Sequence, residues 1–141
     1  MNIAIPGMTA IDSPERIEKL RQELCKMPQY EPITRHYFHG GMYCREVWRQ
    51  AGVALVGAVH KKEHFYVIVS GTVVINGGQR ITGPMVLCCE PGTQRAVFSE
   101  TDVLCMTFHK TDARTVEEAE AELIEATVSM YGPGNTLKAL S

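Results

Sequence analysis

Short runs of alternating apolar and polar residues fill the middle of the chain, from about residue 34 to residue 110. They are rich in β-branched and aromatic residues and are separated by turn-forming residues, which is typical of an all-β sandwich or barrel. Asn76-Gly77-Gly78 is a strong turn signal and predicts a tight hairpin. The predicted strands are His36–Phe38, Tyr43–Arg49, Ala54–Val59, Phe65–Val69, Thr72–Ile75, Met85–Cys89, Ala96–Phe98 and Val103–His109.

A helix is predicted before the strands. Ser13 is a suitable N-cap, Pro14 suits the first helical position, and Pro28 marks the end. The apolar stripe of this helix is expected to pack on the body of the domain, although contact with a partner subunit is the alternative. Its members are Ile17, Leu20 and Leu24.

A second helix is predicted after the strands. Thr115 and Glu118 have the spacing of a capping box, with Thr115 as the N-cap. The tail that follows is expected to dock through Leu137 and Leu140. The predicted buried stripe of the helix consists of Val116, Ala119, Leu123 and Ala126.

Composition narrows the class of protein. The 141 residues suit one domain, and a net charge of -2 offers no basic field for nucleic acid. Five cysteines without a CxxC pair favour reduced thiols over a disulfide scaffold. The first residues lack the features of a signal peptide, and no apolar segment is long enough to cross a bilayer, so neither secretion nor membrane insertion is expected.

The stretch from Gly52 to Gly71 resembles the first motif of the cupin superfamily, G-x5-H-x-H-x3-E-x6-G. Both terminal glycines and the second histidine, His60, keep the spacing of that motif. Ala58 stands at the position of the first histidine, and His64 stands at that of the glutamate. A full set would hold a divalent metal, so the resemblance implies a ligand pocket with an altered metal set.

A second stretch resembles the other cupin motif, G-x5-P-x-G-x2-H-x3-N. Gly92 and the turn around it are retained, whereas Arg95 replaces the histidine and Ser99 replaces the asparagine. The resemblance covers about residues 35–110 and implies an all-β fold, a single cupin-type jelly-roll β-barrel with an N-terminal and a C-terminal helix. The expected divisions are an N-terminal arm and helix over 1–34, the cupin β-barrel over 35–110, and a C-terminal helix and tail over 111–141.

A narrower resemblance extends nearly end to end, to small cupin-like proteins encoded among the structural genes of tailed phages and prophages. It implies a phage-associated protein without an established reaction, located in the host cytoplasm or the virion. The expected partners are further copies of the chain, in a homo-oligomer, and other phage structural proteins. The segments that carry this resemblance are Lys26-Met27-Pro28-Gln29-Tyr30-Glu31-Pro32-Ile33-Thr34-Arg35-His36-Tyr37-Phe38, Tyr43-Cys44-Arg45-Glu46, His60-Lys61-Lys62-Glu63-His64, Glu90-Pro91-Gly92-Thr93-Gln94-Arg95 and His109-Lys110-Thr111-Asp112.

His60 and His64 are the candidate metal ligands, for one divalent transition metal. On a straight strand they would lie about 13 Å apart at ~3.3 Å per residue. Both can reach one metal only if the chain bends between them, since Zn–N bonds are about 2.0–2.1 Å. His36, His39 and His109 are expected instead at strand ends or on the surface.

Arg95 and Tyr66 are the candidate ligand-binding residues. An arginine is never a normal metal ligand and prefers an anion such as a carboxylate or phosphate. Alternatively, Arg95 pairs with Glu63, Glu90 or Glu46 and only stabilises the barrel. The pocket is therefore structural, a metal site or an anion site.

Three functions remain open from the sequence. The favoured one is a non-enzymatic structural or interaction component of a phage particle or its assembly. The second is a metal-dependent cupin enzyme or a binding protein for a carboxylate or sugar, using His60 and His64. The third is a regulator that binds a small anion through Arg95.

Overall fold

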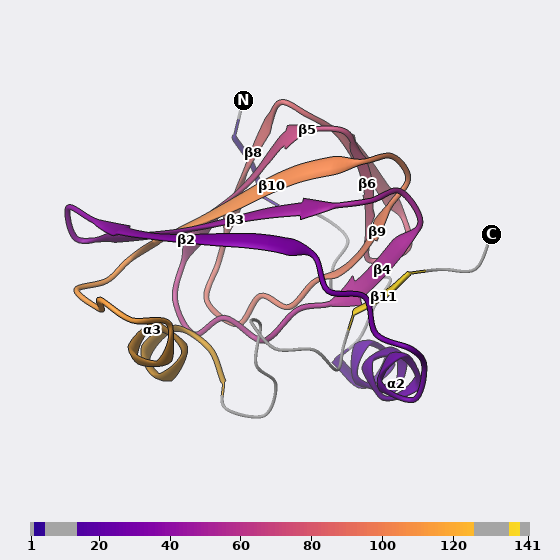
Figure 1. Ribbon diagram of the computed structural model, residues 1–141, viewed down its shortest axis with the longest axis horizontal. Coiled ribbons are helices and arrows are strands. Elements are labelled where there is room, and N and C mark those ends of the chain that lie inside the picture. The colour runs from indigo at the N-terminus through magenta and orange to yellow at the C-terminus, as the bar shows by residue number, and fades with distance from the viewer. Residues whose placement is uncertain (1, 5–13, 126–135, 139–141) are drawn as a thin grey trace.

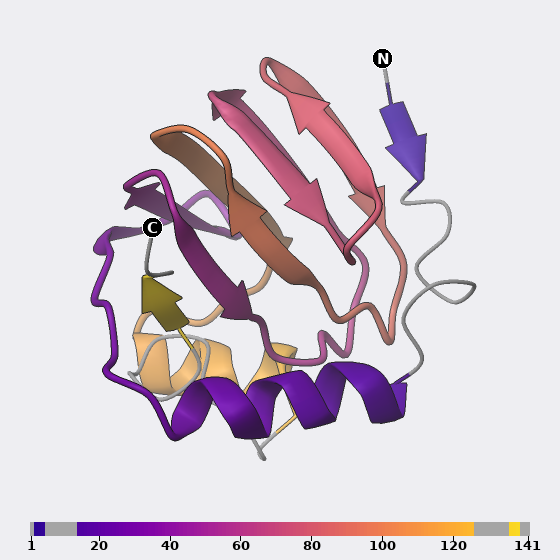
Figure 2. The same cartoon turned by 90° about the vertical axis from the view of Figure 1, so that its right-hand side faces the viewer.

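The computed structural model describes residues 2–4, 14–125 and 136–138, and it is mostly β with two helices. The strands face one another in two layers, and both helices lie at the same end of the two layers (Figures 1 and 2). The elements are β1 (Asn2–Ala4), α2 (Pro14–Cys25), β2 (Ile33–His39), β3 (Met42–Arg49), β4 (Val53–Val56), β5 (His64–Ser70), β6 (Thr72–Ile75), β7 (Gln79–Thr82), β8 (Met85–Cys89), β9 (Ala96–Ser99), β10 (Val103–Lys110), α3 (Val116–Leu123) and β11 (Thr136–Lys138).

The strands form two separate sheets. One has six strands in the order β1-β8-β5-β10-β3-β2, and the other has five in the order β11-β4-β9-β6-β7. Every pair is antiparallel except β1 with β8. The sequence predicts a closed barrel, but the described strands pair within each sheet and leave the two sheets unjoined by hydrogen-bonded strands.

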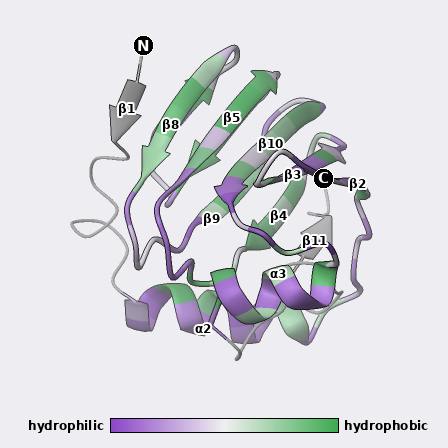
Figure 3. Cartoon of the chain, turned by 90° about the vertical axis from the view of Figure 1, so that its left-hand side faces the viewer, coloured by the Kyte–Doolittle hydropathy of each residue, from purple (hydrophilic) through white to green (hydrophobic). Residues whose placement is uncertain are grey.

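The main core lies between the two sheets. Because side chains alternate along a strand, each sheet turns one apolar set inward. Ile68 and Leu87 come from the six-stranded sheet and are fully buried, and Val73 and Ile75 meet them from the five-stranded sheet. Figure 3 shows how hydrophobic β5 and β8 are along their length.

Helix α2 packs on the body of the domain, which agrees with the favoured prediction. Ile17 and Leu24 are buried against Val56 of β4 and Ala96 of β9. Leu20, the third member of the predicted stripe, is 42% exposed instead. The predicted N-cap, Ser13, lies outside the described residues.

Helix α3 begins as predicted. The Thr115 hydroxyl accepts a hydrogen bond from the backbone N–H of Glu118, which satisfies one of the unpaired donors of the first turn. Ala119 and Leu123 are buried in a small cluster with Tyr43. Ala126, the last predicted member of the buried stripe, lies outside the described residues.

All eight predicted strands are present, with ends shifted by a few residues. The predicted hairpin turn is also present, since Asn76 and Gly77 both have positive φ between β6 and β7. The sequence missed β7, whose residues Gln79–Thr82 are mostly polar. Leu137 lies in β11, paired with β4, whereas Leu140 lies outside the described residues.

The thiol prediction is confirmed, because all five cysteines are free. Among the described residues, no helix has the length and apolar character needed to span a membrane.

Gly71 is the position where the turn between β5 and β6 depends most on the absence of a side chain. Its φ is +90°, and an added Cβ would overlap the carbonyl oxygen of Asp102. Gly92 has a similar φ of +88° but open space around it. We expect Gly92→Ala to lower the free energy of unfolding by about 1–2 kcal/mol, the cost of the backbone conformation alone.

Gly71→Ala should cost at least about 1–2 kcal/mol more, because the backbone must also shift. Urea unfolding followed by circular dichroism measures both values. Equal losses in the two variants would contradict the steric argument.

Candidate metal centre

Three buried histidines converge at one end of the space between the sheets. They come from three places in the sequence: His60 precedes β5, His64 begins β5, and His109 lies near the end of β10. Each offers a ring nitrogen, and these atoms all lie within 4.8 Å of one another. The sequence predicted two of these residues as ligands and the third, His109, at a capped or solvated strand end, whereas His109 is buried.

The backbone around His60 holds it beside the sheet rather than in it. Its N–H donates to the carbonyl of Thr93 at 3.0 Å, and its carbonyl accepts from the N–H of Gly92 at 2.7 Å. The chain then bends over Lys61 and Lys62 before β5 begins. This is the bend that a shared site required, and it brings the ring centroids of His60 and His64 to 4.1 Å.

Helix α3 ties the two histidine segments together. Glu122 accepts from Lys62 Nζ at 3.0 Å and from Thr111 Oγ1 at 2.9 Å. Lys62 lies between the first two histidines, and Thr111 lies two residues after His109. The Glu122 carboxylate of α3 therefore connects the segment that carries His60 and His64 to the segment that carries His109.

The β10 strand brings in the third histidine. Thr107 pairs with Arg45 of β3 on one side and with Tyr66 of β5 on the other. Since alternate residues face the same way, His109 shares the inward face with Thr107. His109 is 1% exposed.

Hydrogen bonds define which ring nitrogens are available. The Nδ1 atom of His64 lies 3.2 Å from the carbonyl oxygen of Lys62, which only accepts, so Nδ1 carries the proton and Nε2 offers a lone pair. His60 Nδ1 and His109 Nε2 share a hydrogen bond of 2.9 Å. The buried Nδ1 of His109 has no hydrogen-bond partner in the described part of the chain.

All three imidazoles are held neutral. Burial lowers the pKa of each, and the positive charge of Arg95 lowers it further. The pKa of His60 falls well below 6.5, that of His64 falls to about 3, and that of His109 falls to about 4. Neutral imidazole is the form that binds a metal ion.

This donor set fits a transition metal. Two nitrogens bound to one ion at about 2.1 Å lie at most about 4.2 Å apart, so metal binding would require the rings to rotate. It would also require the hydrogen bonds at His64 Nε2 and between His60 and His109 to open. The hydrogen bond from His64 to the Lys62 carbonyl fixes the orientation of the ring, as such bonds commonly do for metal-binding histidines. Three imidazoles would leave coordination positions open.

Arg95 lies against the site. Its Nη1 donates to Nε2 of His64 at 3.0 Å and to Cys89 Sγ at 3.3 Å. Its guanidinium carbon lies 4.1 Å from the centre of the Tyr66 ring, a cation–π contact. The alternative pairing of Arg95 with Glu63, Glu90 or Glu46 is wrong, because no described carboxylate lies within ion-pair distance, and Glu46 instead pairs with Arg35 at 3.9 Å.

A second buried arginine was missed by the sequence analysis. Arg49 ends β3 on its inward face and is 6% exposed. Its guanidinium donates to Ser99 Oγ, Tyr66 Oη and Cys105 Sγ at 3.2–3.3 Å. Arg49, Arg95, Tyr66 and His60 all line a cavity of about 60 Å³ between the sheets.

The remaining histidines lie outside the triad. His39 is exposed at the end of β2, as predicted. His36 is half-buried within the strand, and its Nδ1 hydrogen-bonds to the Tyr43 hydroxyl at 2.6 Å. His109 carried one signal in the sequence: it continues the spacing of Val103, Cys105 and Thr107, the inward residues of β10.

No family model matches the sequence, and no curated protein matches it. Solved structures that resemble it include cupin proteins. An acetylacetone dioxygenase from Acinetobacter johnsonii has 11% identity and a TM-score of 0.49 over 60% of this chain and 65% of that one. A cupin superfamily protein from Desulfitobacterium hafniense has 13% identity and a TM-score of 0.49 over 61% and 83%. The cupin domain of Cnp3 from Schizosaccharomyces pombe has 16% identity and a TM-score of 0.46 over 67% and 74%.

These likenesses are distant. This chain spans 65% of the length of the Acinetobacter protein.

The lowered histidine pKa values predict loss of stability in acid. Above about pH 7 the histidines are neutral both in the folded and in the unfolded chain. Between about pH 6.5 and pH 4 the unfolded chain binds protons that the folded triad does not. The free energy of unfolding should therefore fall as the pH falls, by up to about 1.4 kcal/mol per pH unit for each histidine.

Urea unfolding of chelator-treated protein at several pH values measures this slope. His109→Gln should make the slope shallower, by up to about 1.4 kcal/mol per pH unit, because the variant has one fewer histidine that binds a proton on unfolding. An identical slope in wild type and His109→Gln would contradict the assignment of this histidine as buried and neutral.

Proposed function

We propose that this chain is a cupin-type protein that binds one divalent transition metal through His60, His64 and His109. The observation that carries the proposal is the meeting of three buried, neutral imidazoles from separate segments. The motif spacing from Gly52 to Gly71 supports a cupin-type jelly roll around the site.

The bound metal would act on a small ligand. A divalent ion held by three imidazoles supplies a Lewis acid with open positions, which can polarise an oxygen of a ligand. His60 lines the cavity as well as belonging to the triad, so a ligand in the cavity would lie beside the ion.

The direct test is metal binding by the purified chain. After removal of bound metal with a chelator, Zn²⁺ titrated against a chromophoric competitor should bind at about one ion per chain. His60→Gln, His64→Gln and His109→Gln should each weaken binding by about a hundredfold or more, since even the loss of a group that only hydrogen-bonds to a ligand costs about 10–100-fold.

His39→Gln is the matched control, because His39 is exposed and outside the triad. It should leave the affinity unchanged. Undiminished Zn²⁺ binding in the three triad variants, or none in the wild type, would overturn the proposal.

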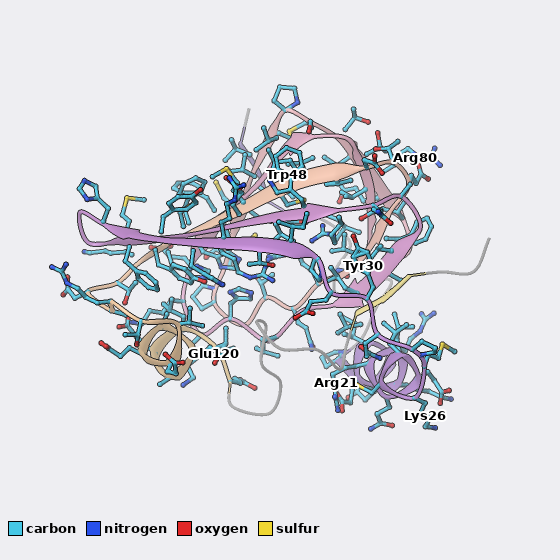
Figure 4. All side chains as sticks on the ribbon, in the orientation of Figure 1. Arg21, Lys26, Tyr30, Trp48, Arg80 and Glu120 are labelled. Carbon is cyan, nitrogen blue, oxygen red and sulfur yellow. The ribbon has the colours of Figure 1, made fainter. Side chains whose placement is uncertain are left out.

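A second candidate function is that of a structural subunit, as the resemblance to phage-encoded cupin-like proteins implies. The outer face of the six-stranded sheet favours it. Trp48, Phe65 and Tyr37 are 44–46% exposed there, and Ile33 is 64% exposed. Figure 4 shows Trp48 on the side of this sheet away from both helices. Exposed apolar patches of this kind mark contact surfaces.

The partner we propose for this face is a second copy of the chain. Arg35 and Glu46 lie on the same face, paired across β2 and β3. In a two-fold arrangement the Arg35 of each copy can meet the Glu46 of the other, because such an interface uses the same patch twice.

Multi-angle light scattering tests this subunit contact. The wild type should be dimeric at about 10 µM, and Trp48→Glu should shift it to the monomer because burying an unpaired carboxylate costs several kcal/mol. Phe98→Glu, on the other sheet and 37% exposed, is the control and should remain dimeric. A wild type that is monomeric throughout would contradict the proposal.

A further inference from the structure

The interior of the molecule holds positive charge without a negative partner. Arg49 and Arg95 are 6% and 7% exposed, and guanidinium groups stay charged in proteins. None of their hydrogen-bond partners is a carboxylate: the partners are a hydroxyl, a phenol, two cysteine sulfurs and an imidazole. Among the described residues no carboxylate pairs with either. Burying two such charges costs free energy that a bound anion would offset.

Both guanidiniums belong to one cluster around Tyr66. Arg49 donates to the Tyr66 hydroxyl at 3.3 Å, and Arg95 lies over the face of the same ring. No hydrogen bond in the described part of the chain uses Nη1 of Arg49 or Nη2 of Arg95. Donors therefore remain on both groups for a ligand between the sheets.

An independent observation points to the same ligand. Thr107 lines the cavity, is 4% exposed, and its Oγ1 has no hydrogen-bond partner in the described structure. A buried hydroxyl without a partner is unfavourable, because it has lost its hydrogen bonds to water. A ligand oxygen in the cavity would accept its hydrogen bond.

The cavity limits the size of the ligand. Its volume is about 60 Å³, space for a few water molecules and far below the several hundred Å³ of pockets for drug-sized ligands. Val47, Leu55, Val56 and Val97 line it beside the polar groups. We infer that the cavity is a binding site for a short-chain monocarboxylate, held by Arg49 and Arg95 with Thr107 as a further donor.

The carboxylate would lie next to the histidine triad, and here the inference rests on the proposed metal site. Arg95 touches His64, so its charge opposes a divalent ion there. A bound carboxylate would offset that charge and strengthen metal binding. Because coupling between two ligands is reciprocal, the metal would strengthen carboxylate binding by the same factor, which we expect to be about tenfold.

Calorimetry with sodium acetate on the chelator-treated full chain tests the anion site, with sodium chloride at equal ionic strength as the blank. Acetate should bind at one site with a Kd of about 1 mM, within the limit for a ligand of four heavy atoms. Arg49→Met should weaken binding at least tenfold. Arg80→Met is the matched control: Arg80 is exposed on the five-stranded sheet, is paired with Glu100, and lies on the side of the molecule away from the two helices (Figure 4).

Thr107→Val is a variant that is expected to fold, since valine has a shape similar to threonine and lacks only the unpaired hydroxyl. It should weaken acetate binding several-fold. No acetate binding by the wild type, binding of inorganic phosphate in its place, or affinity unchanged in both Arg49→Met and Thr107→Val would overturn the inference.

The double variant His64→Gln/His109→Gln separates this site from the metal site. It should lose Zn²⁺ binding and keep acetate binding. If the wild type binds acetate but not Zn²⁺, the anion site is supported and the proposed metal-binding function is wrong. If it binds Zn²⁺ but not acetate, the proposed function is supported and the anion site is wrong.

Discussion

Buried positive charge without a carboxylate is the constraint on which the interior of this protein depends. Arg49 and Arg95 enter an otherwise apolar space between two sheets and are stabilised there by dipoles, thiols and a tyrosine ring. The positive charge of Arg95 lowers the pKa of all three histidines and, together with burial, keeps the imidazoles neutral. Protonated histidines beside two buried arginines would place four or five positive charges in this space, which is strongly unfavourable. The buried arginines therefore require the histidines to stay neutral.

The positions of the three histidines depend on contacts far apart in the sequence. The Gly92–Thr93 turn fixes the backbone of His60, and the register of β10 against β3 and β5 fixes His109. Glu122 then links the segments that carry them. The site is therefore part of the fold's framework and does not rest on a loop that moves independently.

Sequence patterns predicted the strands and the two helices well because these depend on local alternation, turns and caps. His60 and His64 were proposed from the resemblance to the first cupin motif, whose spacing belongs to one continuous stretch. His109 and Arg49 escaped because their roles come from strand register and from which face of a strand points inward. Both residues lie on strands that the sequence did predict, at positions whose side chains point inward. The alternation of apolar residues along β3 and β10 would therefore have identified them as inward-facing polar residues.

The buried polar and charged groups also distinguish between the candidate functions. A protein used only as a building block gains nothing from two buried guanidiniums, an unpaired Thr107 hydroxyl and a stacked histidine cluster, and apolar residues of similar size would stabilise it better. Buried polar groups that lack a hydrogen-bond or charge partner are a usual sign of a ligand site. The outer apolar face of the six-stranded sheet is compatible with a ligand site, because it lies on the opposite side of the same strands. One sheet can therefore present a subunit contact outward and a metal and anion site inward.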